Sequence, residues 1–204
     1  MAMQVLVVFC HPARDSYVGS ILDALAARLE AGGHAVRVID LYAEGFDPVL
    51  DREAWTAHRQ GRSHEDPNLA AHISALRTCE ALIFVFPTWW YGLPAMLKGW
   101  LDRTWQPNVA FTLEGGVFQT HALKGIRRFA AISTHGSPGW FIEWIVGAPV
   151  WRQLMRGLGL QFASGLRTCW RPIYAVDGRS QADLAQARDR AVSDVAQFLD
   201  RGRP

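Results

Sequence analysis

The sequence predicts an α/β fold in which helices cover both faces of a doubly wound, five-stranded parallel sheet. Short, continuous apolar runs at 4–9 and 81–86 suit strands that are buried on both faces. Runs of this kind alternate along the chain with segments whose apolar residues recur at helical spacing, an alternation typical of parallel sheets. With 204 residues, 50% of them hydrophobic, we expect a single domain over residues 1–204.

The first half of the chain is expected to supply three strands and two helices. The polar stretch 40–68 contains two prolines and no clean period, so we expect a long connection there with room for one short helix. Within 16–31 the apolar residues recur at helical spacing, and two glycines follow as a stop signal. The strands are predicted at 4–9, 35–39 and 81–86, and the helices at 16–31 and 69–78.

The second half continues the alternation. Pro94 opens a helix at its first turn, where its missing N–H costs nothing. The C-terminal segment is amphipathic and predicts the last helix. The elements expected here are a helix at 94–104, a strand at 128–133, part of a helix at 150–156, part of a strand at 166–170 and a helix at 180–199.

Composition narrows the classes of partner. The net charge of +2, from 21 basic and 19 acidic side chains, does not indicate a nucleic-acid binder. Three cysteines without CxxC spacing favour neither disulfides nor a metal site. No secretory leader is recognisable, and no run approaches the ~18 apolar residues of a membrane span. We therefore expect a cytoplasmic protein whose partners are small molecules or a second copy of itself.

Nine tryptophans are more than a core of this size usually needs. They could be core or dimer-interface residues, or they could form the walls of a site for a flat aromatic ligand. Several stand near predicted loops: Trp89, Trp90, Trp100, Trp105, Trp140, Trp144 and Trp151.

Three loops follow the predicted strands at the edge where such sheets bind ligands. For the strand order 2-1-3-4-5, that position lies between the first and third strands. The first loop, 11–20, leads into a helix N-terminus, where free N–H groups favour an anion such as a phosphate. It matches neither a dinucleotide fingerprint nor a Walker loop. Ser16 could instead be only an N-cap, and His11 only a turn residue.

The other two loops are aromatic and glycine-rich. Residues 87–94 hold Trp89, Trp90 and Tyr91 in a row, which suits a cover for a flat ring or, alternatively, a dimer contact. Residues 133–141 combine small polar residues with glycines that allow close backbone approach to a ligand. Together the three loops predict one cleft.

These segments resemble the NAD(P)H:quinone oxidoreductases of the DT-diaphorase type. The most specific match is 87–103, PTWWYGLPAMLKGWLDR. The resemblance runs in order from about residue 5 to 136 and implies a flavodoxin-like homodimer that holds FAD, or FMN in some members, near the subunit interface. Further matching segments are 11–20, 40–42 with Phe46 and Pro48, 108–111, Gly115-Gly116 and 123–125.

The resemblance also implies roles for individual residues. Val18 stands where the family commonly has asparagine, so only a backbone contact carries over, and His135 stands in a loop that often reads Thr-Thr-Gly-Gly. The implied contacts are His11, Ser16, Tyr17 and Val18, with Ser20 in the same turn, for the flavin phosphates; Pro87, Thr88, Trp89, Trp90 and Tyr91 for the isoalloxazine; and Thr134, His135 and Gly136 for its pyrimidine edge.

The function expected from this resemblance is hydride transfer from NAD(P)H, through the flavin, to a quinone or similar small acceptor. His135 is the candidate catalytic residue, stabilising charge on the N1–C2=O edge, although it could instead be a loop histidine that faces solvent. A nitro-compound, azo-compound or flavin reductase would need the same cleft, and a regulatory subunit of a potassium efflux system is a further alternative. The sequence leaves FAD against FMN and NADH against NADPH open.

Overall fold

The computed structural model describes residues 2–112, 120–162 and 164–201. Gly115-Gly116, matched in the sequence, lies outside the described residues. Five parallel strands form one sheet in the order β2-β1-β3-β6-β7, which is the predicted order counted along the sheet-forming strands. The strands are β1 (Gln4–Phe9), β2 (Ala35–Asp40), β3 (Ala81–Pro87), β6 (Arg128–Thr134) and β7 (Arg167–Ile173).

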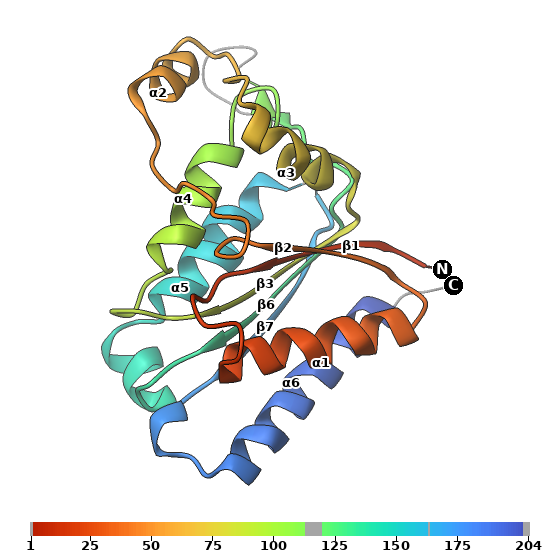
Figure 1. Cartoon of the computed structure of the whole chain (residues 1–204), viewed down its shortest axis with the longest axis vertical. Helices are drawn as coiled ribbons and strands as arrows, with labels where there is room; N and C mark the ends of the chain where they lie inside the picture. The colour runs from red at the N-terminus through yellow and green to blue at the C-terminus, as the bar shows by residue number, and fades with distance from the viewer. Residues whose placement is uncertain (1, 113–119, 163, 202–204) are drawn as a thin grey trace.

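Helices cover both faces of the sheet (Figure 1). On one face α1 (Tyr17–Ala31) and α6 (Gln181–Asp200) pack together, and on the other lie α3 (Pro67–Thr78), α4 (Ala95–Thr104) and α5 (Pro149–Trp151). Strand β3 serves both layers, because Phe84 packs into the α3 and α4 side while Val85 packs into the α1 and α6 side. This double burial explains the unbroken apolar run of β3.

The long connection after β2 carries one short helix, α2 (Arg52–Arg59), as the sequence allowed. Side-chain contacts near both ends of this connection hold it against the layer of α3 and α4. The largely buried carboxylate of Asp66 forms an ion pair with the buried Arg103, and His72 shares a 2.8 Å hydrogen bond with Glu44. Gly99 is needed where α4 crosses this connection, because a Cβ there would lie 2.2 Å from the carbonyl oxygen of Pro48.

The segment between β6 and β7 departs from the prediction. The expected helix at 150–156 is α5 for only three residues and continues as a π-helix, Arg152–Gly157, after an earlier π-helix at Phe141–Ile145. A short 3₁₀ turn follows at Leu158–Gln161, and another lies after β7 at Val176–Gly178. A small antiparallel pair, β4 (Phe111–Thr112) and β5 (Thr120–His121), was also not predicted. In the part of the chain that the structure describes, no helix is long and apolar enough to cross a membrane.

Candidate functional site

The loops after β1, β3 and β6 meet at one cavity of about 500 Å³ beyond the carboxyl ends of the strands. A smaller cavity of about 180 Å³ adjoins it, and Thr88, Trp90 and Gly136 line both. All of the predicted site residues except Ser20 line one cavity or the other. The larger is lined by His11, Ser16, Tyr17, Val18, Pro87, Thr88, Trp89, Trp90, Thr134, Gly136, Val176, Asp177 and Leu184, and the smaller also by Tyr91, His135, Ser137 and Ile142.

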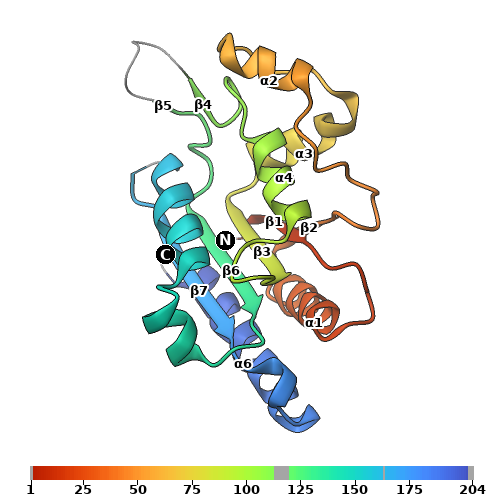
Figure 2. The ribbon, with the colours of Figure 1, turned by 90° about the vertical axis from the view of Figure 1, so that its left-hand side faces the viewer.

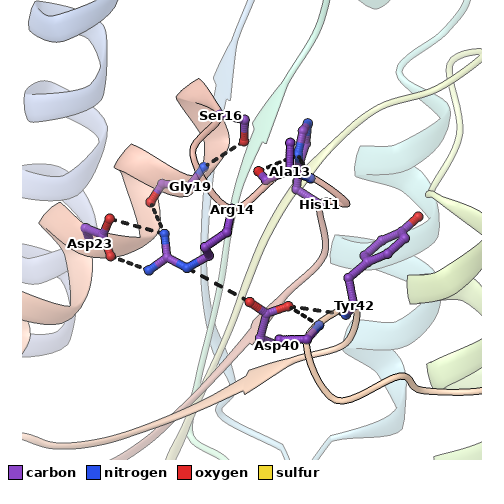
Figure 3. A network of polar contacts seen from close by, with 9 residues as sticks. His11, Ala13, Arg14, Ser16, Gly19, Asp23, Asp40 and Tyr42 are labelled. Carbon is purple, nitrogen blue, oxygen red and sulfur yellow. Dashed lines mark hydrogen bonds and ion pairs between the residues drawn. The ribbon is translucent and has the colours of Figure 1, made fainter.

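The first wall is the turn from β1 into α1, shown in Figure 3. The Ser16 hydroxyl accepts a hydrogen bond from the Gly19 N–H at 3.2 Å, so Ser16 is the N-cap of α1, and it also lines the cavity. The first N–H groups of α1, at Tyr17 and Val18, have no intrahelical acceptor because they lie in the first turn. The His11 Nδ1 atom lies 3.0 Å from the backbone nitrogen of Ala13, which ties the ring to the turn.

Arg14 braces this turn from outside (Figure 3). Its guanidinium forms an ion pair with Asp23, approaches Asp40 to 3.9 Å and donates to the carbonyl oxygen of Gly19 at 3.2 Å. The hydrogen bond from Arg14 lowers the pKa of Asp23. Close packing at Gly19 is essential, since a Cβ there would lie 2.0 Å from the Arg14 carbonyl oxygen.

Ser20 does not line the cavity, in contrast to the other residues predicted for this turn. It lies one turn inside α1, and its hydroxyl donates to the Tyr17 carbonyl oxygen at 2.7 Å. This bond within the helix directs the hydroxyl away from the cavity.

The second wall is the aromatic turn after β3. Trp89 and Gly92 exchange backbone hydrogen bonds of 3.3 and 3.0 Å, which closes a tight turn. Trp90 and Tyr91 at its tip have φ angles of 51° and 62°, in the left-handed region. Backbone strain of this kind costs on the order of 1–3 kcal/mol per residue and clusters at functional sites. The turn holds Trp90 at the rim of both cavities with 95% of its surface exposed.

The third wall contains His135, which the structure buries to 3% exposure. This excludes the alternative of a histidine that faces solvent. Its Nδ1 atom lies 3.1 Å from the Thr88 Oγ1, and its Nε2 atom lies 2.8 Å from the Ser133 Oγ. Burial lowers its pKa from 6.5 to about 4, so the ring is neutral at physiological pH. Both ring nitrogens bond to protein hydroxyls, an arrangement that suits a positioning role.

Gly136 brings the third wall close to the chain that follows β7. A Cβ at Gly136 would lie 2.5 Å from the Asp177 Oδ2, which shows how closely the two segments approach. Asp177, Val176 and Leu184 form a fourth wall that the sequence did not predict. The predicted strand ended at 170, whereas β7 runs to Ile173. The loop after Ile173 could have been included in the predicted cleft, because ligands bind beyond the carboxyl ends of strands in sheets of this kind.

A hydrogen bond of 2.8 Å from the Tyr17 hydroxyl to the carbonyl oxygen of Leu184 joins the first and fourth walls. The site therefore combines aromatic surfaces, hydroxyl groups and unpaired N–H groups at a helix start, a chemistry that suits a flat ligand carrying an anionic group. Within the described ranges, no group of three or more histidine, cysteine, aspartate or glutamate side chains could hold a metal ion.

The strand order and the cavity beyond the strand ends define an α/β protein of the doubly wound class. A family model described as having a flavodoxin-like fold matches residues 3–198. The chain belongs to this family.

The relatives are named as oxidoreductases. The chain is 34% identical over 108 residues to an uncharacterized NAD(P)H oxidoreductase of Escherichia coli (strain K12), covering 53% of this chain and 55% of that protein. It is 28% identical over 149 residues to NAD(P)H dehydrogenase (quinone) 1 of Rattus norvegicus, covering 65% and 53%. The chain spans about half the length of these curated relatives.

Two solved structures share the fold over nearly the whole chain. An NAD(P)H:quinone oxidoreductase from Methanothermobacter marburgensis superposes with a TM-score of 0.85 at 24% identity, covering 98% of this chain and 100% of the other. An FMN-dependent NADH-azoreductase from Bacillus anthracis, in complex with FMN, gives a TM-score of 0.72 at 15% identity, covering 96% and 98%.

Proposed function

We propose that this chain is a flavin-dependent oxidoreductase that takes electrons from NAD(P)H and passes them to a quinone or a similar small acceptor. The observation that carries the proposal is the convergence of the turn at His11–Val18, the aromatic turn and the His135 loop on one cavity. The names of the relatives support the same activity.

The residues present fit a flavin, either FMN or FAD. The unpaired N–H groups of Tyr17 and Val18 and the ring of His11 would hold its phosphate. Trp89 and Trp90 would cover the ring system, and Thr134 and Gly136 would meet its edge. When bound, the flavin supplies the hydride chemistry, accepting from NAD(P)H and delivering to the acceptor.

The protein's own contribution is to hold the ring and keep one face open to both substrates in turn. The exposed rim at Trp90 leaves such a face accessible. We propose that His135 acts as a positioning residue, holding Thr88 through the 3.1 Å hydrogen bond rather than carrying charge itself. An azo-compound reductase is a second candidate, supported by the name of the B. anthracis neighbour.

We further propose that the chain forms a homodimer. Large apolar side chains stay exposed around the cavity and on the segment between β6 and β7, among them Trp144 at 84% and Ile145 at 67%. Figure 2 shows α4 beside the segment that contains α5. A mainly apolar groove of about 590 Å³ lies there, lined by Leu101 of α4 and Leu154. A second copy covering this surface would bury the exposed side chains.

The activity is tested by NAD(P)H oxidation with menadione as acceptor, using protein reconstituted with FMN or FAD. We expect acceptor-dependent turnover that is lost without flavin. A panel that adds an azo dye and free flavin separates the candidate acceptors. Absence of turnover with every acceptor, by protein that holds flavin, would contradict the proposal.

The binding role of Trp89 is tested by Trp89→Ala. Loss of aromatic contact is worth about 1 kcal/mol, so flavin affinity should fall by roughly fivefold to tenfold. Trp55→Ala, which removes an exposed tryptophan on α2 outside the cavity, is the matched control and should leave affinity unchanged. Equal affinity of Trp89→Ala and wild type would argue against stacking at Trp89.

A further inference from the structure

Thr88 lines both cavities of the candidate site. Thr88 directly follows β3, and its backbone N–H donates to the Thr134 carbonyl oxygen at 2.8 Å, which continues the pairing of β3 with β6. Its Oγ1 lies 3.0 Å from that same carbonyl oxygen and 3.1 Å from the His135 Nδ1. The side chain is therefore held by two partners and has one orientation.

The direction of each hydrogen bond follows from counting protons. A threonine hydroxyl has one proton, and a carbonyl oxygen can only accept, so the Thr88 proton is directed to Thr134. The His135 Nδ1 must then carry the proton that it shares with Thr88 Oγ1. The unprotonated Nε2 accepts in turn from the Ser133 hydroxyl at 2.8 Å. Every proton in this network is assigned with His135 neutral.

This assignment leaves the Thr88 hydroxyl oxygen with one unused lone pair. A hydroxyl oxygen has two lone pairs, and His135 uses one of them. The other is the only hydrogen-bonding function that the Thr88 side chain can offer to the cavities, so the hydroxyl acts toward a ligand as an acceptor only. Ser133 and His135 keep the Thr88 hydroxyl in this acceptor role. The assigned protons of Ser133 and His135 are used within the network: the Ser133 hydroxyl proton bonds to His135, and the His135 ring proton bonds to Thr88.

As a hydrogen-bond acceptor, the Thr88 hydroxyl can pair with only one group on the ring edge of a flavin. The ring edge of oxidised isoalloxazine carries a single N–H group, at N3, while N1, O2, O4 and N5 are acceptors. We propose that the Thr88 Oγ1 accepts the N3–H hydrogen bond of the bound oxidised flavin and so fixes the pyrimidine edge at the junction of β3 and β6. This inference rests on the proposed flavin function and adds the orientation of the ring and its selecting residue.

The test compares FMN and FAD with their N3-methyl derivatives by fluorescence titration of the apoprotein. For wild type we expect the methylated flavin to bind about tenfold to hundredfold more weakly, as for loss of a buried hydrogen bond. In Thr88→Val, which keeps the shape but removes the hydroxyl, the ratio of the two affinities should fall at least fivefold. Thr88→Ser restores the hydroxyl and should restore the ratio.

Equal binding of both flavins by wild type overturns the inference, as does the same affinity ratio in wild type and Thr88→Val. If the valine variant does not fold, Thr88→Ala gives the same comparison. Failure of the underlying function has a different signature, because wild type would then bind neither FMN nor FAD.

Discussion

The position of His135 could be predicted from the sequence, but its burial and its pKa could not. Its loop position was evident from the sequence, whereas its burial depends on Trp170 and Tyr174, whose ring centroids lie 6.2 and 4.8 Å from its own. Both residues belong to the last strand and the chain after it, far along the sequence. These contacts remove water from the ring and lower its pKa, with a measurable effect on stability.

The free energy of unfolding should depend on His135 between pH 4 and 6.5. The folded pKa of about 4 lies below the unfolded value of 6.5, so the unfolded chain takes up a proton first as the pH falls. The contribution of His135 is therefore complete above pH 6.5 and is lost toward pH 4, by roughly 3 kcal/mol. Urea denaturation of wild type and His135→Gln across this range measures it.

His58→Gln, which replaces an exposed histidine on α2, is the control for that series. The stability difference between wild type and His135→Gln should shrink as the pH falls. A difference that stays constant from pH 7 to 4 would contradict the burial of a neutral imidazole.

Gly19 is the residue on which the turn at the start of α1 depends. Gly19→Ala would place a methyl group 2.0 Å from the Arg14 carbonyl oxygen, so the turn must shift. Overpacking of this kind costs about 1–3 kcal/mol, and flavin affinity should fall with it. In Gly157→Ala the nearest atom would be 3.6 Å away, an ordinary contact, so this control should fold normally. Wild-type stability of Gly19→Ala would show that the turn tolerates a side chain.

At the scale of elements, hydrophobic spacing was a good guide wherever an element packs on the sheet. β1, β3 and α1 were predicted to within a residue at each end, because their apolar residues face the two cores. The segment between β6 and β7 was not, since its π-helices at 141–145 and 152–157 have no signature in residue spacing. The 40–68 connection is held by an ion pair and a hydrogen bond between residues that are distant in sequence, and hydrophobic periodicity does not predict such contacts.

The largely buried ion pair of Asp66 and Arg103 is expected to hold that connection in place. Asp66→Asn keeps the cap on α3, where Asp66 accepts from the Asn68 N–H at 2.9 Å, but leaves Arg103 without its counter-charge. Removing one partner of a buried pair costs about 3–5 kcal/mol. Asp102→Asn, which breaks the exposed pair with Lys98, should cost less than about 1 kcal/mol. Similar losses in the two variants, measured by urea denaturation, would contradict this difference.

At the scale of the whole molecule, the strand order and the position of the site followed from the alternation of elements and from the rule for doubly wound sheets. All three predicted loops line the cavities, so the sequence identified most of the residues around them. The wall at Asp177 was missed because the predicted last strand stopped short of Ile173.

The exposed apolar surface around Trp144 is where we propose that a second copy of the chain binds. Trp144→Glu would place a charge in the surface that we expect a second copy to cover, and the dimer should dissociate into monomers in light scattering coupled to size exclusion. Val38→Glu, on the edge strand β2, is the control and should leave the mass unchanged. A wild-type protein that is monomeric at every concentration would rule the dimer out.

We propose that the cavity at the ends of β1, β3 and β6 binds a flavin. The most direct measurement incubates the purified protein with FMN and FAD, removes free ligand by desalting, and records the flavin absorbance bands together with the mass of the compound released on heating. We expect one flavin to be retained per chain, with reduced retention in Trp89→Ala. Colourless protein after incubation with both flavins would contradict it.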